Sequence, residues 1–182
     1  MKKTILTFGL ISGAVEALLV FSTMPFVYRF GFDKGLIVGY TIIVVSLLLV
    51  PFGIWSYREN VGGGSITFGR AFAVGILITL ISCICYVLAW EIVYYNFLPD
   101  FAEKYTAYMV EKQKASGATQ QVIDATLQEM KGMKAMLDNP LTFAVIGFTE
   151  PFPVGLIITT ISAAILRKKR QIDPQTAEQV IA

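Results

Sequence analysis

Four apolar stretches constrain this 182-residue chain more than any other feature of its sequence. They run over about residues 5–26, 36–57, 68–97 and 141–166, and each is rich in Ile, Leu, Val and Phe with very few charges. About 20 helical residues cross the roughly 30 Å hydrocarbon core of a bilayer. Four helices of that length cannot all be buried inside one small soluble domain. We therefore predict an all-α integral membrane protein built on a four-helix bundle, with the lipid bilayer as its solvent.

The composition agrees with this prediction and excludes several functions. Hydrophobic residues make up 55% of the chain and charged residues 15%, whereas soluble domains average about 45–50% and 25%. The formal net charge of +2 is too small for a nucleic-acid-binding surface. The chain has no His and two Cys, so it lacks the commonest general base and the usual metal-ligand sets. We expect no nucleic-acid partner, no metal, no cofactor and no enzymatic activity.

Basic residues predict the orientation, because cytoplasmic loops carry an excess of Lys and Arg. With the N-terminus inside, the cytoplasmic side receives eight of them: Lys2, Lys3, Arg58, Arg70, Arg167, Lys168, Lys169 and Arg170. The first outer loop then holds Arg29 and Lys34, and the long outer segment holds five lysines beside six acids. We predict a multi-pass protein with both termini cytoplasmic, a single membrane domain over residues 1–170 and a short polar tail over 171–182. We expect the first span to be retained, because Glu16 interrupts its apolar run and no small-residue cleavage site follows.

The segment over about residues 98–139 is too long for a plain loop. Two stripes recur at helical spacing, the first formed by Phe97, Phe101, Tyr105 and Tyr108 and the second by Thr126, Met130, Met133 and Leu137. Ser116-Gly117 separates them, which predicts an amphipathic helical hairpin outside the membrane. Two interpretations stay open. The helices pack on each other or on the bilayer surface, or their Met-rich face is a docking platform for protein partners.

Small residues at intervals of four mark close helix contacts in membranes. Gly9 and Gly13 form such a pair in the first span, and Gly31, Gly35 and Gly39 repeat the spacing at the start of the second. Contacts within one bundle and formation of a homodimer both explain the pattern.

The inner loop over residues 61–72 contains three consecutive glycines, but it lacks the phosphate-binding P-loop pattern. Ser65 or Thr67 is a suitable cap for the third helix. Arg70 is expected at the level of the lipid headgroups, where it is a candidate contact for an anionic headgroup.

This loop resembles the signature of a known family. The glycine-rich turn, Ser65-Ile66-Thr67-Phe68 and Arg70-Ala71-Phe72 are similar to a motif of small four-span bacterial membrane proteins of unknown function. The aromatic segment 94–101 and the early acid of the last span, Glu150, are similar as well. The resemblance covers about residues 4–170, and it departs from the family pattern where residues 97–98 separate Asn96 from Pro99. It implies the four-span fold in a bacterial inner membrane, and it implies no activity.

Three acids lie inside the predicted spans: Glu16, Glu91 and Glu150. Ionisable residues inside a membrane are costly and are functional candidates by default. At about 1.5 Å per residue, we expect all three between the midplane and the outer leaflet, where they can converge. Apart from Arg70 at the inner start of the third span, no Lys or Arg lies in a span to neutralise them, so we expect at least one to be protonated at neutral pH.

Prolines and glycines surround the last of these acids, at Gly147, Pro151, Pro153 and Gly155. Proline removes backbone donors and so frees upstream carbonyl groups. Because lipid does not tolerate such irregularity, those carbonyls must face protein or a wet cavity, as in the broken helices of transporters.

Two functions therefore remain. The first is a non-enzymatic accessory or scaffold protein that binds partners through the outer hairpin. The alternative is a proton- or cation-coupled small transporter or channel that uses the intramembrane glutamates. The glutamates also have a purely structural interpretation, in which they form hydrogen bonds that fix the helix register.

Overall fold

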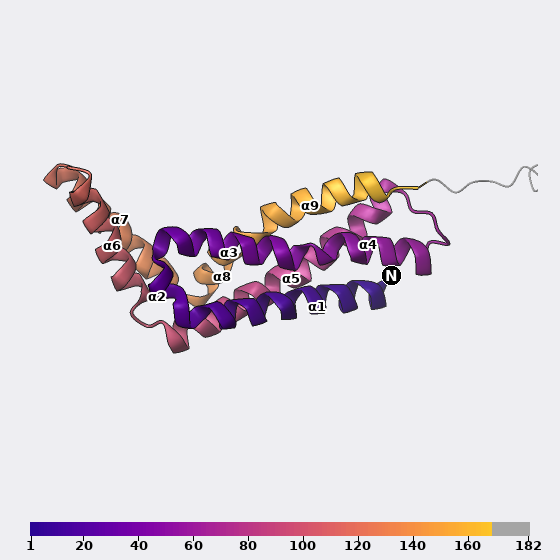
Figure 1. Cartoon of the computed structure of the whole chain (residues 1–182), viewed down its shortest axis with the longest axis horizontal. Helices are drawn as coiled ribbons and strands as arrows, with labels where there is room; N and C mark the ends of the chain where they lie inside the picture. The colour runs from indigo at the N-terminus through magenta and orange to yellow at the C-terminus, as the bar shows by residue number, and fades with distance from the viewer. Residues whose placement is uncertain (169–182) are drawn as a thin grey trace, which may run out of the picture.

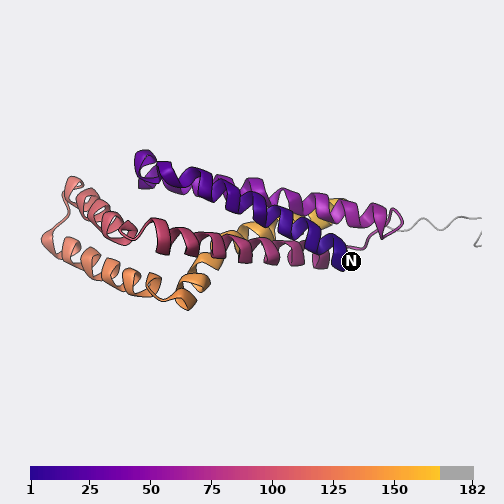
Figure 2. The same ribbon diagram turned by 90° about the horizontal axis from the view of Figure 1, so that it is seen from below.

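The computed structural model describes residues 1–168, so Lys169, Arg170 and the predicted tail lie outside the described residues. The described chain is helical apart from short connections and one isolated bridge, which confirms the all-α prediction. The segments long and apolar enough to cross a membrane are α1 (Lys2–Thr23), α3 with α4 (Phe32–Leu47, Leu49–Asn60), α5 (Phe68–Phe97) and α8 with α9 (Pro140–Phe148, Pro151–Leu166). They run along a common axis, as Figures 1 and 2 show.

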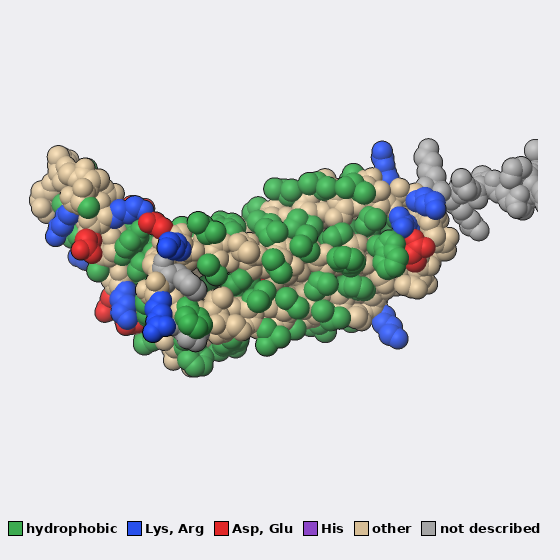
Figure 3. All heavy atoms as spheres, viewed as in Figure 1, with side chains coloured by type: hydrophobic (Ala, Val, Ile, Leu, Met, Phe, Trp, Pro, Cys, Tyr) green, Lys and Arg blue, Asp and Glu red, His purple; other side chains and the backbone are tan. Residues whose placement is uncertain are grey.

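The longest helix, α5, is the centre of the bundle. It packs against α1, α4, α8 and α9. Its inward face buries Val74 and Ile78, which meet Leu47 and Ile54 of the second span in one hydrophobic core. Hydrophobic side chains also cover the outside of the bundle between its two charged ends (Figure 3). That outer belt is the surface expected of helices solvated by lipid.

Prolines interrupt two of the four spans. Pro51 cannot donate a hydrogen bond to the Leu47 carbonyl group, and the second span is broken at Leu48, between α3 and α4. The fourth span is broken at Thr149 and Glu150, immediately before Pro151. The prolines after Glu150 predict the second of these breaks from the sequence, whereas the break at Leu48 was not predicted.

The glycine pairs differ in their surroundings. A Cβ atom at Gly13 would lie 2.5 Å from the Cβ of Cys85 on α5, and one at Gly9 would lie 2.8 Å from the Cβ of Ile81. These two glycines therefore allow α1 to approach α5 closely. A Cβ atom at Gly35 or Gly39 would meet nothing within 4 Å, so that part of the pattern makes no close contact within the chain.

This contrast gives a testable prediction. We expect Gly13→Ala to lower the free energy of unfolding by roughly 1–3 kcal/mol, because the added methyl group overpacks the α1–α5 contact. The matched control Gly39→Ala should be neutral or stabilising by up to about 1 kcal/mol, since alanine favours a helix over glycine. Thermal unfolding of both variants in one detergent measures the difference. Equal destabilisation by the two substitutions would contradict this packing argument.

The glycine-rich turn joins α4 to α5 and is held against the end of α9. Ile66 and Lys168 exchange two backbone hydrogen bonds of 2.9 Å each, and the Ile66 side chain is buried. Thr67 caps α5 by accepting a hydrogen bond from the Arg70 backbone N–H at 3.4 Å. The start of α1 and the end of α9 lie at this same end of the bundle (Figure 1), which we call the terminal end.

Two helices project from the opposite end, α6 (Phe101–Ala115) and α7 (Gln120–Leu137). They pack against each other, and Gly117, at φ +75°, makes the turn between them. The chain reaches α3 from α1 through η1 (Met24–Phe26) and α2 (Val27–Phe30). We call this the hairpin end.

The aromatic stripe of α6 packs on the first residue of α3. The Phe32 ring centroid lies 5.6 Å from that of Phe101, 5.1 Å from that of Tyr105 and 5.1 Å from that of Tyr108. We call these four rings the Phe32 cluster. Beside it, the Lys112 Nζ atom lies 2.8 Å from Asp33 Oδ1. The aromatic stripe therefore makes an intramolecular contact, which attaches α6 to the second span.

Candidate functional site

Glu16 lies on α1 and is completely buried, with 0% of its surface exposed. Its Oε2 atom is 2.8 Å from Ser82 Oγ on α5, and Ser82 Oγ is 2.9 Å from Ser12 Oγ on α1. Ser12 Oγ is in turn 2.8 Å from the carbonyl oxygen of Ser46 on α3. We call this row of four residues the hydroxyl row. It joins three spans in the middle of the bundle.

The hydroxyl row has more contacts than hydroxyl hydrogens. Each of the three contacts needs one hydrogen, and the Ser46 carbonyl oxygen can only accept. Ser12 therefore donates to Ser46, and Ser82 has one hydrogen for two contacts, with Ser12 and with Glu16 Oε2. All three contacts are hydrogen bonds only if the Glu16 carboxyl group carries the third hydrogen. The other oxygen, Oε1, has no hydrogen-bond partner, which is far less costly for a neutral carboxyl group than for a buried carboxylate.

Glu150 lies in a different setting, at the junction of α8 and α9. Its side chain is exposed, and its Oε2 atom accepts a hydrogen bond of 2.6 Å from the Tyr86 hydroxyl group. Tyr86 is one turn after Ser82 on α5, so the same helix face presents both contacts. Glu16 and Glu150 therefore approach neighbouring turns of α5 from different helices.

Glu150 lines a cavity of about 340 Å³ near the hairpin end. Its walls come from six helices, including Gly39 of α3, Tyr86, Trp90 and Tyr94 of α5, Met133 of α7 and Gly147 of α8. Phe101 and Tyr105 of α6 line it as well, so both projecting helices help to enclose it. Among the described lining residues, Glu150 is the only Asp, Glu, Lys or Arg.

The predicted set of site residues is divided between several places. Trp90 lines the cavity, and the next residue, Glu91, is rotated by about 100° around the helix relative to it. Glu91 is half-buried and is not among the lining residues. Gly155 lies at the α5–α9 contact, where an added Cβ atom would collide with Thr79. Arg70 is exposed at the terminal end, far along α5 from the cavity.

The two prolines act on the cavity through the backbone. Pro151 cannot donate the helical hydrogen bond to the Gly147 carbonyl group, and Pro153 cannot donate one to Thr149. Gly147 lines the cavity and has no side chain, so it contributes its backbone. The broken helix therefore presents part of its carbonyl end beside Glu150.

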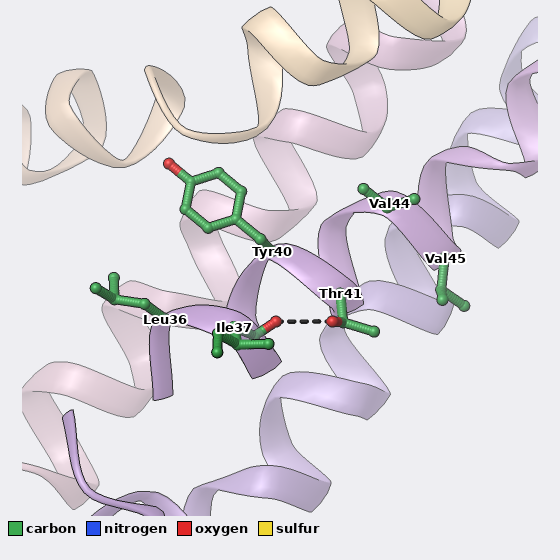
Figure 4. A pocket seen from close by; sticks show the side chains of 6 residues that line it. All are labelled: Leu36, Ile37, Tyr40, Thr41, Val44 and Val45. Atoms are coloured by element: carbon green, nitrogen blue, oxygen red, sulfur yellow. Dashed lines mark hydrogen bonds between the residues drawn. The ribbon is translucent and has the colours of Figure 1, made fainter. Parts of the chain in front are cut away.

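A second hollow, of about 470 Å³, lies on the outward face of α3 (Figure 4). The Thr41 hydroxyl group donates to the Ile37 carbonyl oxygen at 2.7 Å, as the dashed line in Figure 4 shows. Apart from Thr41 and Tyr40, its lining is aliphatic. Lipid chains suit this surface, which has no charged group to orient a ligand.

The sequence profile of one protein family, described as a protein of unknown function (DUF4199), matches residues 7–168. The chain belongs to this family. The match confirms the resemblance drawn from the glycine-rich turn, and it extends over all four spans of the DUF4199 protein together with α6 and α7. No curated protein and no solved structure matches the chain.

Proposed function

We propose that this DUF4199 protein is a non-enzymatic accessory protein of the bacterial inner membrane, and that it works by binding an amphipathic molecule in the cavity near the hairpin end. The observation that carries the proposal is the joint enclosure of one 340 Å³ space by spans and projecting helices. Small-molecule sites are concave, mostly apolar and fitted with a few polar groups that orient the ligand. This cavity has that character, with one carboxyl group among aromatic and aliphatic walls.

The terminal end is proposed to face the cytoplasm, because basic residues directly flank the spans there: Lys2 and Lys3 at the start of α1, Arg58 in the last turn of α4, Arg70 at the start of α5, and Arg167 and Lys168 after α9. The cavity then lies in the outer half of the membrane, with α6 and α7 above it. The apolar faces of these helices point to the bundle and to the cavity. Contact with a protein partner, the role considered for the hairpin, would therefore use their polar faces.

A cavity-filling substitution tests the proposal. A Cβ atom added at Gly39 meets nothing within 4 Å, and Gly39 lines the cavity, so we expect the side chain of Gly39→Leu to extend into the space. We expect this variant to fold normally and to lose at least about tenfold in affinity for an amphipathic probe, because the probe's place is taken. The matched control is Gly132→Leu on α7, where a Cβ atom also meets nothing within 4 Å but no cavity is filled.

Binding is measured by the fluorescence of Trp90, a lining residue, in purified protein titrated with phenylbutanol. Equal binding by the two leucine variants and the unmodified chain would refute the cavity as the site. Co-purification of native lipid or another amphipathic molecule with the unmodified chain, and less of it with Gly39→Leu, is a second expected result.

Transport coupled to protons or cations is a second candidate, favoured by the one carboxyl group that the cavity exposes. Glu150 is open to a ligand, whereas Glu16 is enclosed and Glu91 does not line the space. A transported ion would therefore act through Glu150. Flux into reconstituted vesicles that is abolished by Glu150→Gln and retained by Glu91→Gln would favour this function over simple binding.

A further inference from the structure

The described lining of the cavity includes one acidic side chain and no basic one. Among the described lining residues, Glu150 is the only one with an ionisable carboxyl group, and no basic side chain lines the space. The hydrogen bond from Tyr86 occupies Glu150 Oε2. The other carboxyl oxygen, on an exposed side chain, is available to a second donor. An acid without a basic neighbour favours a ligand that brings a positive charge.

The end of α8 adds a backbone acceptor beside Glu150. α8 ends at Phe148, and Gly147 of its last turn lines the cavity. Because Pro151 has no N–H group to offer Gly147, that carbonyl lacks its helical hydrogen bond. The helix dipoles add little net charge here, since α9 begins with its positive end at Pro151, where Glu150 is the N-cap.

The aromatic wall completes a site for a cation. Tyr86, Trp90 and Tyr94 are spaced four residues apart, so they share one face of α5, and all three line the cavity. Aromatic ring faces attract cations and are a common means of recognising ammonium groups. A space of 340 Å³ matches the range of about 300–1,000 Å³ found for organic ligands; it is too large and too apolar to be shaped for a bare inorganic ion.

Building on the proposed function, we propose that the ligand is a lipophilic organic cation: an ammonium group held against Glu150 and the end of α8, with its apolar body among the rings of α5. This assignment names the ligand class that the cavity prefers. It requires no movement of the chain and no contribution from Glu16.

Three probes with one apolar body test the assignment: phenylbutylamine, phenylbutanol and phenylbutanoate. The chain has two tryptophans, and Trp55 lies exposed on α4, outside the cavity. In the full chain with Trp55→Phe, Trp90 is thus the sole reporter of binding. The protein is placed in nanodiscs of zwitterionic lipid, so that the bilayer surface does not concentrate one charge.

We expect the amine to bind about tenfold more tightly than the alcohol, and the carboxylate to bind most weakly. Glu150→Gln should bring the affinity for the amine to about that of the alcohol, so that the roughly tenfold ratio between the two probes falls to about one. The variant keeps an oxygen acceptor for the Tyr86 hydroxyl group. Glu91→Gln is the matched control, because this acid lies in a span but does not line the cavity, and it should leave the amine preference intact.

Equal affinities for the three probes would overturn the cation assignment. If Gly39→Leu still blocked them, the proposed function would survive that result. No Trp90 response to any probe would overturn both. The order of the three affinities in the unmodified protein is informative by itself, so the test does not depend on the stability of Glu150→Gln.

Discussion

Glu16→Ala is expected to be strongly destabilising, costing about 3 kcal/mol of unfolding free energy. Glu16 is completely buried, so truncation leaves a void. The truncation also removes the hydrogen-bond partner of Ser82 in the hydroxyl row. Glu16→Gln should behave quite differently and stay within about 1 kcal/mol of the unmodified chain, because its amide group fills the same space and can donate to Ser82 or accept from it.

The pair of variants separates the volume and hydrogen bonding of this side chain from its charge. Equal losses in Glu16→Gln and Glu16→Ala would contradict a neutral hydrogen-bonding role, because the amide keeps both the volume and the hydrogen-bonding groups. Thermal unfolding in one detergent measures both variants, with the half-buried Glu91→Ala as control, expected to cost below about 1 kcal/mol. Infrared spectra give an independent reading. The carbonyl stretch of a protonated carboxyl group should be present at neutral pH and should disappear in Glu16→Gln.

The bundle could be predicted from the sequence because lipid leaves few alternatives. A backbone in hydrocarbon must satisfy its own hydrogen bonds, so long apolar runs have to be helices. The third span runs over Phe68–Phe97, the range that its apolar residues indicate. The boundaries of the others shift by a few residues, since the polar residues at a helix end join the helix without entering the apolar core.

The site was less accessible to sequence reasoning, because it depends on which helix faces meet. Glu16 and Glu150 were found from their charge, yet depth alone grouped them with Glu91, which the helical rotation turns away from the cavity. Tyr86 was missed as the hydrogen-bond partner of Glu150. The spacing of Tyr86, Trp90 and Tyr94 was a usable signal for an aromatic face on α5, although it carries no information about the helix opposite.

The stripes of the projecting helices show the same limit. Their periodicity indicated two amphipathic helices, and it left open what the apolar faces would touch. In the structure, Tyr105 packs on Phe32 and Met133 lines the cavity. Tyr105 and Phe32 lie about 70 positions apart in the sequence, and the cavity that Met133 lines has walls from several other helices. Local spacing could therefore not reveal either contact.

Phe32→Ala is expected to release α6 and α7 from the bundle. The Phe32 ring makes three aromatic contacts with α6, with centroids 5.1 to 5.6 Å away, and a lost ring of this kind in a fully buried site costs about 3–5 kcal/mol. Because Phe32 is only half-buried, we expect a local loss of roughly 2 kcal/mol, which corresponds to about 30-fold faster amide hydrogen exchange in α6. Exchange within α5 should be unchanged.

Lys112→Ala is the informative comparison, because it removes the ion pair beside the same cluster. The side chains of Lys112 and Asp33 are 56% and 69% exposed, and ion pairs so exposed to water contribute little to stability. We therefore expect no measurable change in exchange for this variant. Faster exchange in Lys112→Ala than in Phe32→Ala would mean that charge, rather than ring packing, attaches the two helices. Since Phe32 also lines the cavity, the ring-packing account further requires that Phe32→Ala weaken the binding of phenylbutanol while Lys112→Ala does not.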